Sequence, residues 1–280
     1  MRILIATGGS PHSDKAVRLG GAIASVVGTG PTVLTVVKSQ ANVPEARRRL
    51  EHALTLLPET GEDPDTQIRF GDAAAQILAE AEVGEYQLIV VGERSQHRLL
   101  SRLLSPTSER VIAQARCPVL VAKSVVEDFN RILVCDSGAN DESLLERFTA
   151  QFSRLLTPQT EVTVLHVMSQ IGAAPGVRGW QLRADAESLI DAHTPEGERL
   201  EHNLELLEQS QAHSEPKVRH GRVVDEILAE SECDEYDLIV IGAHRAHGWQ
   251  RLLLDDIAHQ VIRAAERPVL VMRGREAGIR

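Results

Sequence analysis

The sequence predicts an α/β protein made of two similar domains, each a parallel sheet covered by helices on both faces. Two observations predict this fold class: the chain repeats itself, and each repeat alternates short apolar strands with helices. Strands that alternate with helices form parallel sheets, because the right-handed crossover places each helix on a face of the sheet. A length of 280 residues is enough for two ordinary domains.

The repeat is visible when the two halves are compared directly. "RLEHALTLL" returns as "RLEHNLELL", "ILAEAEVGEYQLIVVG" as "ILAESECDEYDLIVIG", and "CPVLVAK" as "RPVLVMR", all about 150 residues further along the chain. The two starts, "RILIATGGS" from Arg2 and "RILVCDSGA" from Arg131, lie only about 129 residues apart. The second copy therefore carries an insertion, at about 171–197. We expect one domain at 1–124 and another at 130–274.

Runs of apolar, often β-branched residues predict buried parallel strands, and helical spacing of apolar residues predicts the helices between them. The first copy has expected strands at 2–6, 32–37, 66–70, 87–92 and 118–122, and helices at 13–27, 47–57, 73–83 and from about 106. The second copy has expected strands at 131–135, 161–167, 216–220, 237–242 and 268–272, with helices over 199–207 and from about 256.

Composition and charge narrow the class of protein. Apolar residues make up 42% and charged residues 25% of the chain, as in globular proteins. The formal net charge of −10 argues against a broad surface for nucleic acid or anionic membranes. Cys117, Cys135 and Cys233 show no disulfide or metal-ligand spacing, and neither a signal peptide nor a run of ~18 apolar residues is visible. We therefore expect a cytoplasmic protein with no nucleic-acid or membrane partner.

Particular segments of both copies resemble the universal stress protein family. They are "ILIATGGSPHSDKAV", the pair "YQLIVVGER" and "YDLIVIGAH", and the pair "SERVIAQARCPVLVAK" and "AHQVIRAAERPVLVMR". The resemblance covers almost all of both halves and implies, for each, a doubly wound five-stranded parallel sheet in the order 3-2-1-4-5 with four helices. It also implies a role in the stress response, in a family whose members differ in whether they bind ATP.

The expected ligand site lies where the strand order reverses, between strands 1 and 4. Ligands of doubly wound sheets bind in the crevice at the carboxyl ends of these strands. The fourth helix points its N-terminus at the same place, where free N–H groups attract phosphate. The crevice is expected between 6–10 and 92–95 in the first copy, and between 135–139 and 242–245 in the second.

ATP-binding members of the family resemble one another in a G-x2-G-x9-G-(S/T) pattern from strand 4 into the fourth helix, and in an acid after strand 1. The first copy keeps Gly92 but has Ser95, Ser105 and Pro106 at the other positions, and Gly8 replaces the acid. The helix start "SPTSE" still offers a serine cap and hydroxyls, and arginines precede it, so this copy could hold an anion.

The second copy has lost the other end of the pattern. It keeps Gly242 and an acid, Asp136, but has Arg245, Asp255 and Asp256 at the remaining positions. A carboxylate at a helix start accepts the free N–H groups itself, and it repels phosphate by about 1 kcal/mol per charge pair at ~4 Å. We expect this site to be degenerate.

The candidate ligand-binding residues of the first copy are Thr7, Gly8, Gly9, Val37, Gly92, Arg94, Ser105, Thr107 and Ser108, and the second copy retains Asp136 and Gly242. ATP or another adenine nucleotide is the cofactor that the resemblance implies. The sequence shows no dedicated residues for holding Mg²⁺ and orienting a water, so we expect a non-catalytic stress-response protein with weak nucleotide or anion binding. A slow ATP-hydrolysing switch and a binder of another small ligand remain the alternatives.

The PVLV strands occupy sheet edges in this fold, and an exposed apolar edge strand tends to pair with another. We expect Val119 to Val121 and Val269 to Val271 to join the two domains as a pseudo-dimer within the chain, and two chains to associate further as a homodimer. The insertion at 171–197 leaves the carboxyl end of strand 2 and is either a lid on the second crevice or a surface element.

Overall fold

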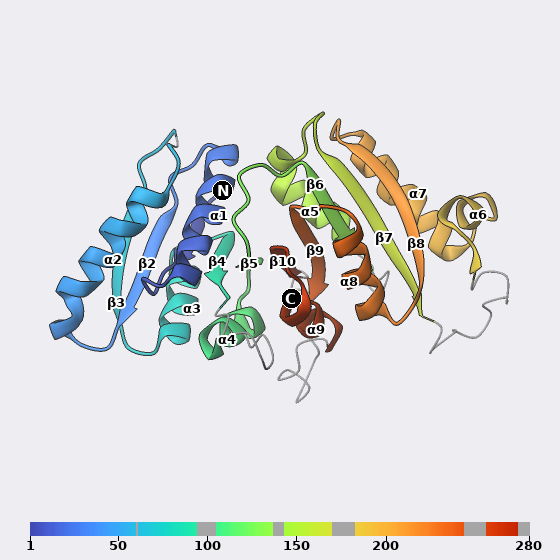
Figure 1. The fold of residues 1–280 in the computed structure, drawn as a ribbon. Coiled ribbons are helices and arrows are strands. Elements are labelled where there is room, and N and C mark those ends of the chain that lie inside the picture. Colours follow the sequence, from blue (N-terminus) through green and yellow to red (C-terminus); the bar gives the residue numbers. More distant parts are fainter. Residues whose placement is uncertain (60, 94–104, 137–142, 170–182, 244–255, 274–280) are drawn as a thin grey trace, which may run out of the picture. The chain divides into compact units, whose positions relative to one another are not determined.

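The computed structural model describes residues 1–59, 61–93, 105–136, 143–169, 183–243 and 256–273. These residues divide into two compact units. Unit 1 comprises 1–128 and 266–273, and unit 2 comprises the remaining described residues, 129–243 and 256–265. The predicted α/β class is confirmed in both units, whose elements Figure 1 colours along the chain.

Unit 1 has five parallel strands in the order β3-β2-β1-β4-β5, as predicted. The helix α1 packs against α2, and α3 packs against α4, because the crossovers on the two sides of β1 lie on opposite faces of the sheet. The elements are β1 (Ile3–Ala6), α1 (Pro11–Val27), β2 (Thr32–Val37), η1 (Gln40–Asn42), α2 (Val43–Leu56), β3 (Asp65–Phe70), α3 (Ala73–Val83), β4 (Leu88–Gly92), α4 (Pro106–Gln114) and β5 (Val119–Ala122).

Unit 2 repeats the order of the first four strands of unit 1, with parallel strands in the order β8-β7-β6-β9. Here α5 packs against α7, and α8 packs against α9. The elements are β6 (Arg131–Cys135), α5 (Leu144–Phe152), η2 (Ser153–Leu155), β7 (Glu161–Ser169), α6 (Ala186–Asp191), α7 (Pro195–Glu208), β8 (His213–Gly221), α8 (Val223–Cys233), β9 (Leu238–Ala243) and α9 (Asp256–Ala264). The helix α6 belongs to the insertion, of which 171–182 lies outside the described residues.

The last described strand, β10 (Val269–Arg273), belongs to unit 1 and pairs antiparallel with β5. Val269 lies opposite Val121, Leu270 opposite Leu120, and Val271 opposite Val119. The predicted pairing of the two PVLV strands is therefore confirmed. All six of these side chains are fully buried, so the apolar edge of β5 is covered as edge strands require.

The strands β3 and β8 end the order of described strands, and each lacks one free backbone donor at the same repeat position. In β3 the N–H of Thr66 donates to the Asp65 carboxylate (2.7 Å). In β8 the equivalent residue is Pro216, which has no N–H.

Each unit buries one glutamate between its third helix and its sheet, at equivalent positions of the repeat. In unit 1, Glu80 is 3% exposed, forms an ion pair with Arg69 and accepts a hydrogen bond from the Tyr86 hydroxyl (3.4 Å). A buried carboxylate is tolerated only when such partners satisfy it. The sequence contains this set twice, because Arg219, Glu230 and Tyr236 occupy the equivalent positions of the second copy.

In unit 2 the buried carboxylate is Glu230, which is fully buried and has three donors. They are Lys217 Nζ (2.8 Å), Arg219 Nη1 (2.7 Å) and the Tyr236 hydroxyl (2.9 Å). Burial by itself would raise the pKa of Glu230, but these hydrogen bonds hold its pKa below the ordinary value. The glutamate therefore stays ionised and fixes α8 against the edge strand β8.

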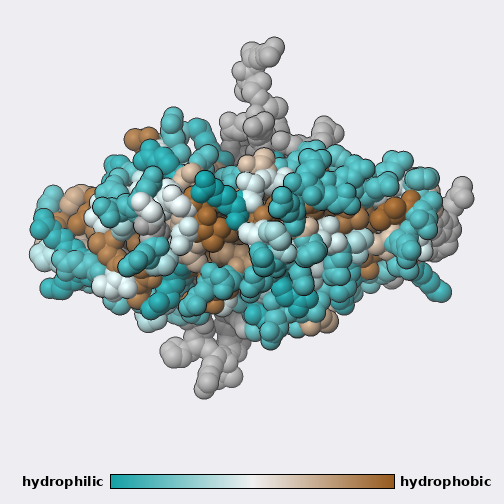
Figure 2. All heavy atoms as spheres, turned by 90° about the horizontal axis from the view of Figure 1, so that it is seen from above, coloured by the Kyte–Doolittle hydropathy of each residue, from teal (hydrophilic) through white to brown (hydrophobic). Residues whose placement is uncertain are grey.

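No helix among the described residues is long and apolar enough to cross a membrane. On the face shown in Figure 2, hydrophilic residues cover most of the surface and hydrophobic ones form smaller areas between them.

Replacing Glu230 with glutamine should destabilise unit 2 at neutral pH. We expect a loss of about 2–4 kcal/mol, because the partly exposed Lys217 and Arg219 lose the buried charge that they neutralise. Urea denaturation followed by circular dichroism measures this loss. The exposed Glu232 on the same helix is the control, and Glu232→Gln should cost less than about 0.5 kcal/mol. Equal losses in the two variants would contradict the role given to Glu230.

The same carboxylate predicts a pH dependence. Because the folded-state pKa of Glu230 lies below its ordinary value, its contribution is complete above the unfolded pKa of about 4.3 and is lost as the pH falls through the folded pKa. The difference in stability between the wild type and Glu230→Gln should therefore be smaller at about pH 3.5 than at pH 7. A difference that stays constant would show that the charge of Glu230 is not what stabilises the fold.

Candidate ligand-binding crevices

In unit 1 the candidate crevice lies at the carboxyl ends of β1 and β4, where Thr7 follows β1. The Thr7 N–H donates to the Leu34 carbonyl (2.9 Å), and its hydroxyl accepts from the Gly9 N–H (3.2 Å) and donates to the Ser13 hydroxyl (3.3 Å). Thr7 is buried. Its polar atoms therefore hold the turn between β1 and α1 together.

The two glycines after Thr7 differ in the space around them. Gly9 has φ +72°, and a Cβ there would lie 2.6 Å from Arg49 Cγ. A side chain at position 9 would thus be strained twice, by backbone conformation and by contact. Gly8 is different, because a Cβ there would meet nothing within 4 Å. The position that holds an acid in the ATP-binding pattern is therefore open to a side chain.

Gly92 ends β4 and lies against the first turn of α1. A Cβ at position 92 would come within 2.4 Å of the His12 carbonyl oxygen, so only glycine allows this approach. The Ser108 hydroxyl donates to the Gly92 carbonyl (3.0 Å), which ties the start of α4 to the end of β4. Gly92 thus has a packing role whether or not a ligand is bound.

The polar groups at the start of α4 form hydrogen bonds largely within the protein. Ser105 is the N-cap of the helix, and its hydroxyl accepts from the Ser108 N–H (3.0 Å) and lies 2.9 Å from the Ser108 hydroxyl. Thr107 is half-buried in the first turn.

Val37 ends β2 and is buried, and its carbonyl accepts from the Gly71 N–H (3.0 Å). Arg94 lies outside the described residues.

Beside Gly92 the structure places a charged pair that sequence reasoning missed. Glu93 and Lys123 follow the ends of β4 and β5, and their side chains pair at 3.1 Å while 9% and 2% exposed. Lys15 Nζ donates to the Lys123 carbonyl (2.8 Å). The sequence signal was a charged residue directly after each of two neighbouring buried strands. Because Glu93 neutralises Lys123, the pair adds little net charge to the crevice.

In unit 2 the corresponding acid, Asp136, lies one position before the one expected from the pattern. Its N–H donates to the Leu165 carbonyl (3.1 Å), as the Thr7 N–H does to Leu34, so Asp136 is equivalent to Thr7 and not to Gly8. Its carboxylate accepts from Asn203 Nδ2 (2.8 Å). The acid retained after the first strand is thus bound to α7.

Asn203 is a second residue that sequence reasoning missed. It is 2% exposed, and its side-chain oxygen accepts from the Ser143 hydroxyl (2.8 Å), so it connects Asp136 with the start of α5. His166 Nδ1 lies 3.3 Å from the Asp136 carbonyl oxygen, and burial lowers the pKa of His166. The first copy has Ala53, Asp14 and Thr35 at the positions of Asn203, Ser143 and His166, so it lacks these contacts.

The rest of the second crevice also differs from the first. A Cβ on Gly242 would lie 3.8 Å from Leu144 Cδ1, which is ordinary contact. Ala258 stands where Ser108 stands in the first copy, so this helix has no equivalent of the Ser108 hydrogen bond to the strand. The expectations for Arg245 and Asp255 lie outside the described residues, and the side chain of Asp256 is likewise not described.

Comparison with known proteins agrees with the repeat. A model described as "Universal stress protein family" matches residues 1–123 and again 128–273.

The chain belongs to the universal stress protein family.

As a tandem universal stress protein, the chain is matched over nearly its whole length by one relative and over less than half of it by another. A universal stress protein of Mycolicibacterium smegmatis is 26% identical over 299 aligned residues, covering 98% of this chain and 97% of that protein. A universal stress protein of Thermus aquaticus is 31% identical over 136 residues, covering 43% of this chain and 97% of the relative.

A solved universal stress protein from Archaeoglobus fulgidus DSM 4304 has a TM-score of 0.64 at 21% identity, covering 97% of this chain and 98% of the other. This likeness supports the fold alone. Within the described part of this universal stress protein, no group of three or more His, Cys, Asp or Glu side chains could hold a metal ion.

The glycines that end β4 and β9 provide a matched test of the two crevices. Gly92→Ala should destabilise the protein by about 1–3 kcal/mol, because the added methyl overlaps the His12 carbonyl. Gly242→Ala should change stability by less than about 0.5 kcal/mol, because its methyl has room. Thermal unfolding of the two variants checks both values, and a tolerated Gly92→Ala would contradict the packing role of Gly92.

Proposed function

We propose that this tandem universal stress protein is a non-catalytic stress-response protein whose first copy binds an adenine nucleotide weakly and whose second copy does not. The observation that carries the proposal is the open space at Gly8. Position 8 is open to a side chain, but the glycine there supplies none of the carboxylate contacts that the ATP-binding pattern places at this position. Binding then rests on the start of α4 and on backbone groups alone.

The phosphate end of the first crevice supports weak binding. The N-terminus of α4 directs its helix dipole at an anion in the crevice. However, the hydroxyls of Ser105 and Ser108 already have partners within the protein. An incoming phosphate would have to compete with these hydrogen bonds, which lowers its net gain.

Two separate features of the second crevice support the proposal that it binds no nucleotide. Asp136 is already hydrogen-bonded to Asn203, and it lies one residue away from the position of the acid in the pattern. In addition, the sequence places Asp255 and Asp256 where phosphate would approach the fourth helix. Either feature weakens binding, since the first removes a ligand contact and the second adds like-charge repulsion.

We propose further that the two copies, with a boundary near 124–130, form a pseudo-dimer within the chain. The support is β10, which is the fifth strand of the second copy by sequence but pairs with β5 of the first. Because these two strands cover each other, any homodimer would have to use another surface.

Calorimetric titration of the full chain with Mg-ATP, combined with an assay for released phosphate, tests the proposed function. We expect weak binding with no turnover. Sub-micromolar binding accompanied by hydrolysis would overturn the proposal in favour of an ATP-hydrolysing switch. Saturable binding of an unrelated compound carried by the native protein, detected by mass spectrometry, would favour another ligand.

Replacing Gly8 with aspartate should strengthen nucleotide binding by the first copy. A carboxylate there can accept hydrogen bonds from ribose hydroxyls, and charged hydrogen bonds of this kind are worth roughly a tenfold gain in affinity or more. Gly61→Asp is the matched control, because a Cβ at Gly61 also meets nothing within 4 Å and the change in charge is the same. Equal gains, or none at Gly8, would show that the missing acid does not limit affinity.

A further inference from the structure

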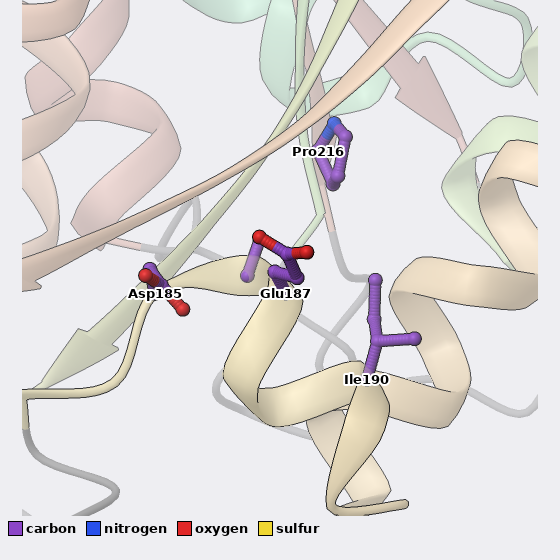
Figure 3. Close-up of a pocket in the computed structure, with 5 residues that line it drawn as sticks. Asp185, Glu187, Ile190 and Pro216 are labelled. Atoms are coloured by element: carbon purple, nitrogen blue, oxygen red, sulfur yellow. The ribbon is translucent and has the colours of Figure 1, made fainter.

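A pocket lies in unit 2 between the insertion helix α6 and the edge strand β8, away from the crevice. Its volume is about 480 Å³, and it is lined by Asp185, Ala186, Glu187, Ile190 and Pro216. Figure 3 shows Asp185 directly before α6, Glu187 and Ile190 on α6, and Pro216, which belongs to β8, facing them. Four of these five residues come from the insertion, so the first copy has no counterpart of this pocket.

The wall formed by α6 is held in place by contacts on both sides. Leu189 is fully buried and packs with Met168 and Ala184, against which Val218 of β8 also packs. His220 Nε2 lies 2.8 Å from the Ala184 carbonyl oxygen, which ties β8 to the segment that leads into α6. The pocket is therefore bordered by elements that pack on one another.

Close packing against α7 fixes the other end of α6. The Thr194 hydroxyl donates to the Leu189 carbonyl (3.1 Å). A Cβ on Gly197 would come within 2.0 Å of the same carbonyl oxygen, so α7 can approach α6 this closely only with glycine there.

Charge is distributed unequally over the two faces of β8. Lys217 and Arg219 pair with carboxylates of α8, including Glu230 and Glu226. Pro216 belongs to the alternate set of residues, which faces α6. The cations of this strand are therefore used on the α8 face.

The described lining of the pocket consequently combines two carboxylates with three apolar residues. Asp185 caps α6, and hydrogen bonds from Ser188 lower the pKa of Asp185, so this carboxylate stays charged. Asp185 and Glu187 are exposed, whereas Ile190 and Pro216 are half-buried and Ala186 is buried. An aliphatic stem fits against the apolar part while a cationic end reaches the carboxylates.

We propose that this pocket docks a lysine or arginine side chain, flanked by an apolar residue, from an extended segment of a partner protein. Charge complementarity selects the cation, and Ile190 and Pro216 contact its methylene groups. Ion pairs with exposed carboxylates contribute little by themselves, so a free cation would bind weakly. A peptide segment adds an apolar side chain that shields the ion pair from solvent, and it therefore fits better than a free cation. The proposal does not depend on nucleotide binding in either crevice.

The test uses the full chain labelled at isoleucine δ1 methyl groups and the probe peptide acetyl-Leu-Lys-Ala-Lys-Leu-amide. We expect the Ile190 methyl resonance to shift saturably with the peptide. The same peptide with glutamates in place of its lysines should cause no shift. An unchanged Ile190 resonance would overturn the proposal.

A charge-removing variant separates the pocket from general electrostatics. Asp185→Asn combined with Glu187→Gln should weaken binding about tenfold, and asparagine still caps α6 so the fold is kept. The control is Glu201→Gln with Glu205→Gln, two exposed residues of α7 whose loss changes the net charge equally and should leave affinity unchanged. Equal weakening in both variants, or displacement of the peptide by lower concentrations of spermidine, would overturn docking of a protein segment.

Discussion

The central strand of each unit is buried on both faces and paired along both edges, and the rest of the structure follows from this constraint. Ile3, Leu4 and Ile5 of β1 are at most 1% exposed, with β2 on one side and β4 on the other. A strand of this kind needs helices on both faces of its sheet, and right-handed crossovers supply them only if the order of the strands reverses beside it. The crevice at the carboxyl ends of β1 and β4, or of β6 and β9, is the result of that reversal.

The residues that line this crevice differ between the two copies, although the order of the strands around it is the same. In unit 1 Gly92 stands where the backbone of His12 comes close, and Ser108 joins the fourth helix to the fourth strand. In unit 2 an aspartate, an asparagine and a serine form a hydrogen-bonded connection between α5 and α7. The second arrangement satisfies its own polar groups, so a ligand would have to break internal hydrogen bonds to use them.

Strands and helices with strong periodicity could be predicted from the sequence, whereas contacts between distant elements could not. The helix α3 was predicted at its observed bounds because its apolar spacing is regular and Asp72 caps it. The helix α2 begins at Val43, before its apolar pattern does, because Pro44 favours the first turn of a helix. Asn203 looked like one more polar residue of α7, and only the fold shows that it is buried against Asp136. The placement of Asp136 depends on strand register, which a shift of one residue in a sequence comparison hides.

The outermost strands share one feature that opposes the addition of further strands at the sheet edges. At one repeat position, the N–H of Thr66 in β3 already donates to the Asp65 carboxylate, and Pro216 in β8 has no N–H. Unpaired edge amides are the templates on which other chains add strands, and that addition is the first step toward cross-β aggregates. Neither copy therefore offers a free amide at this repeat position, although the reason differs between them. The absence of this amide would matter most in a cell where other proteins are unfolding.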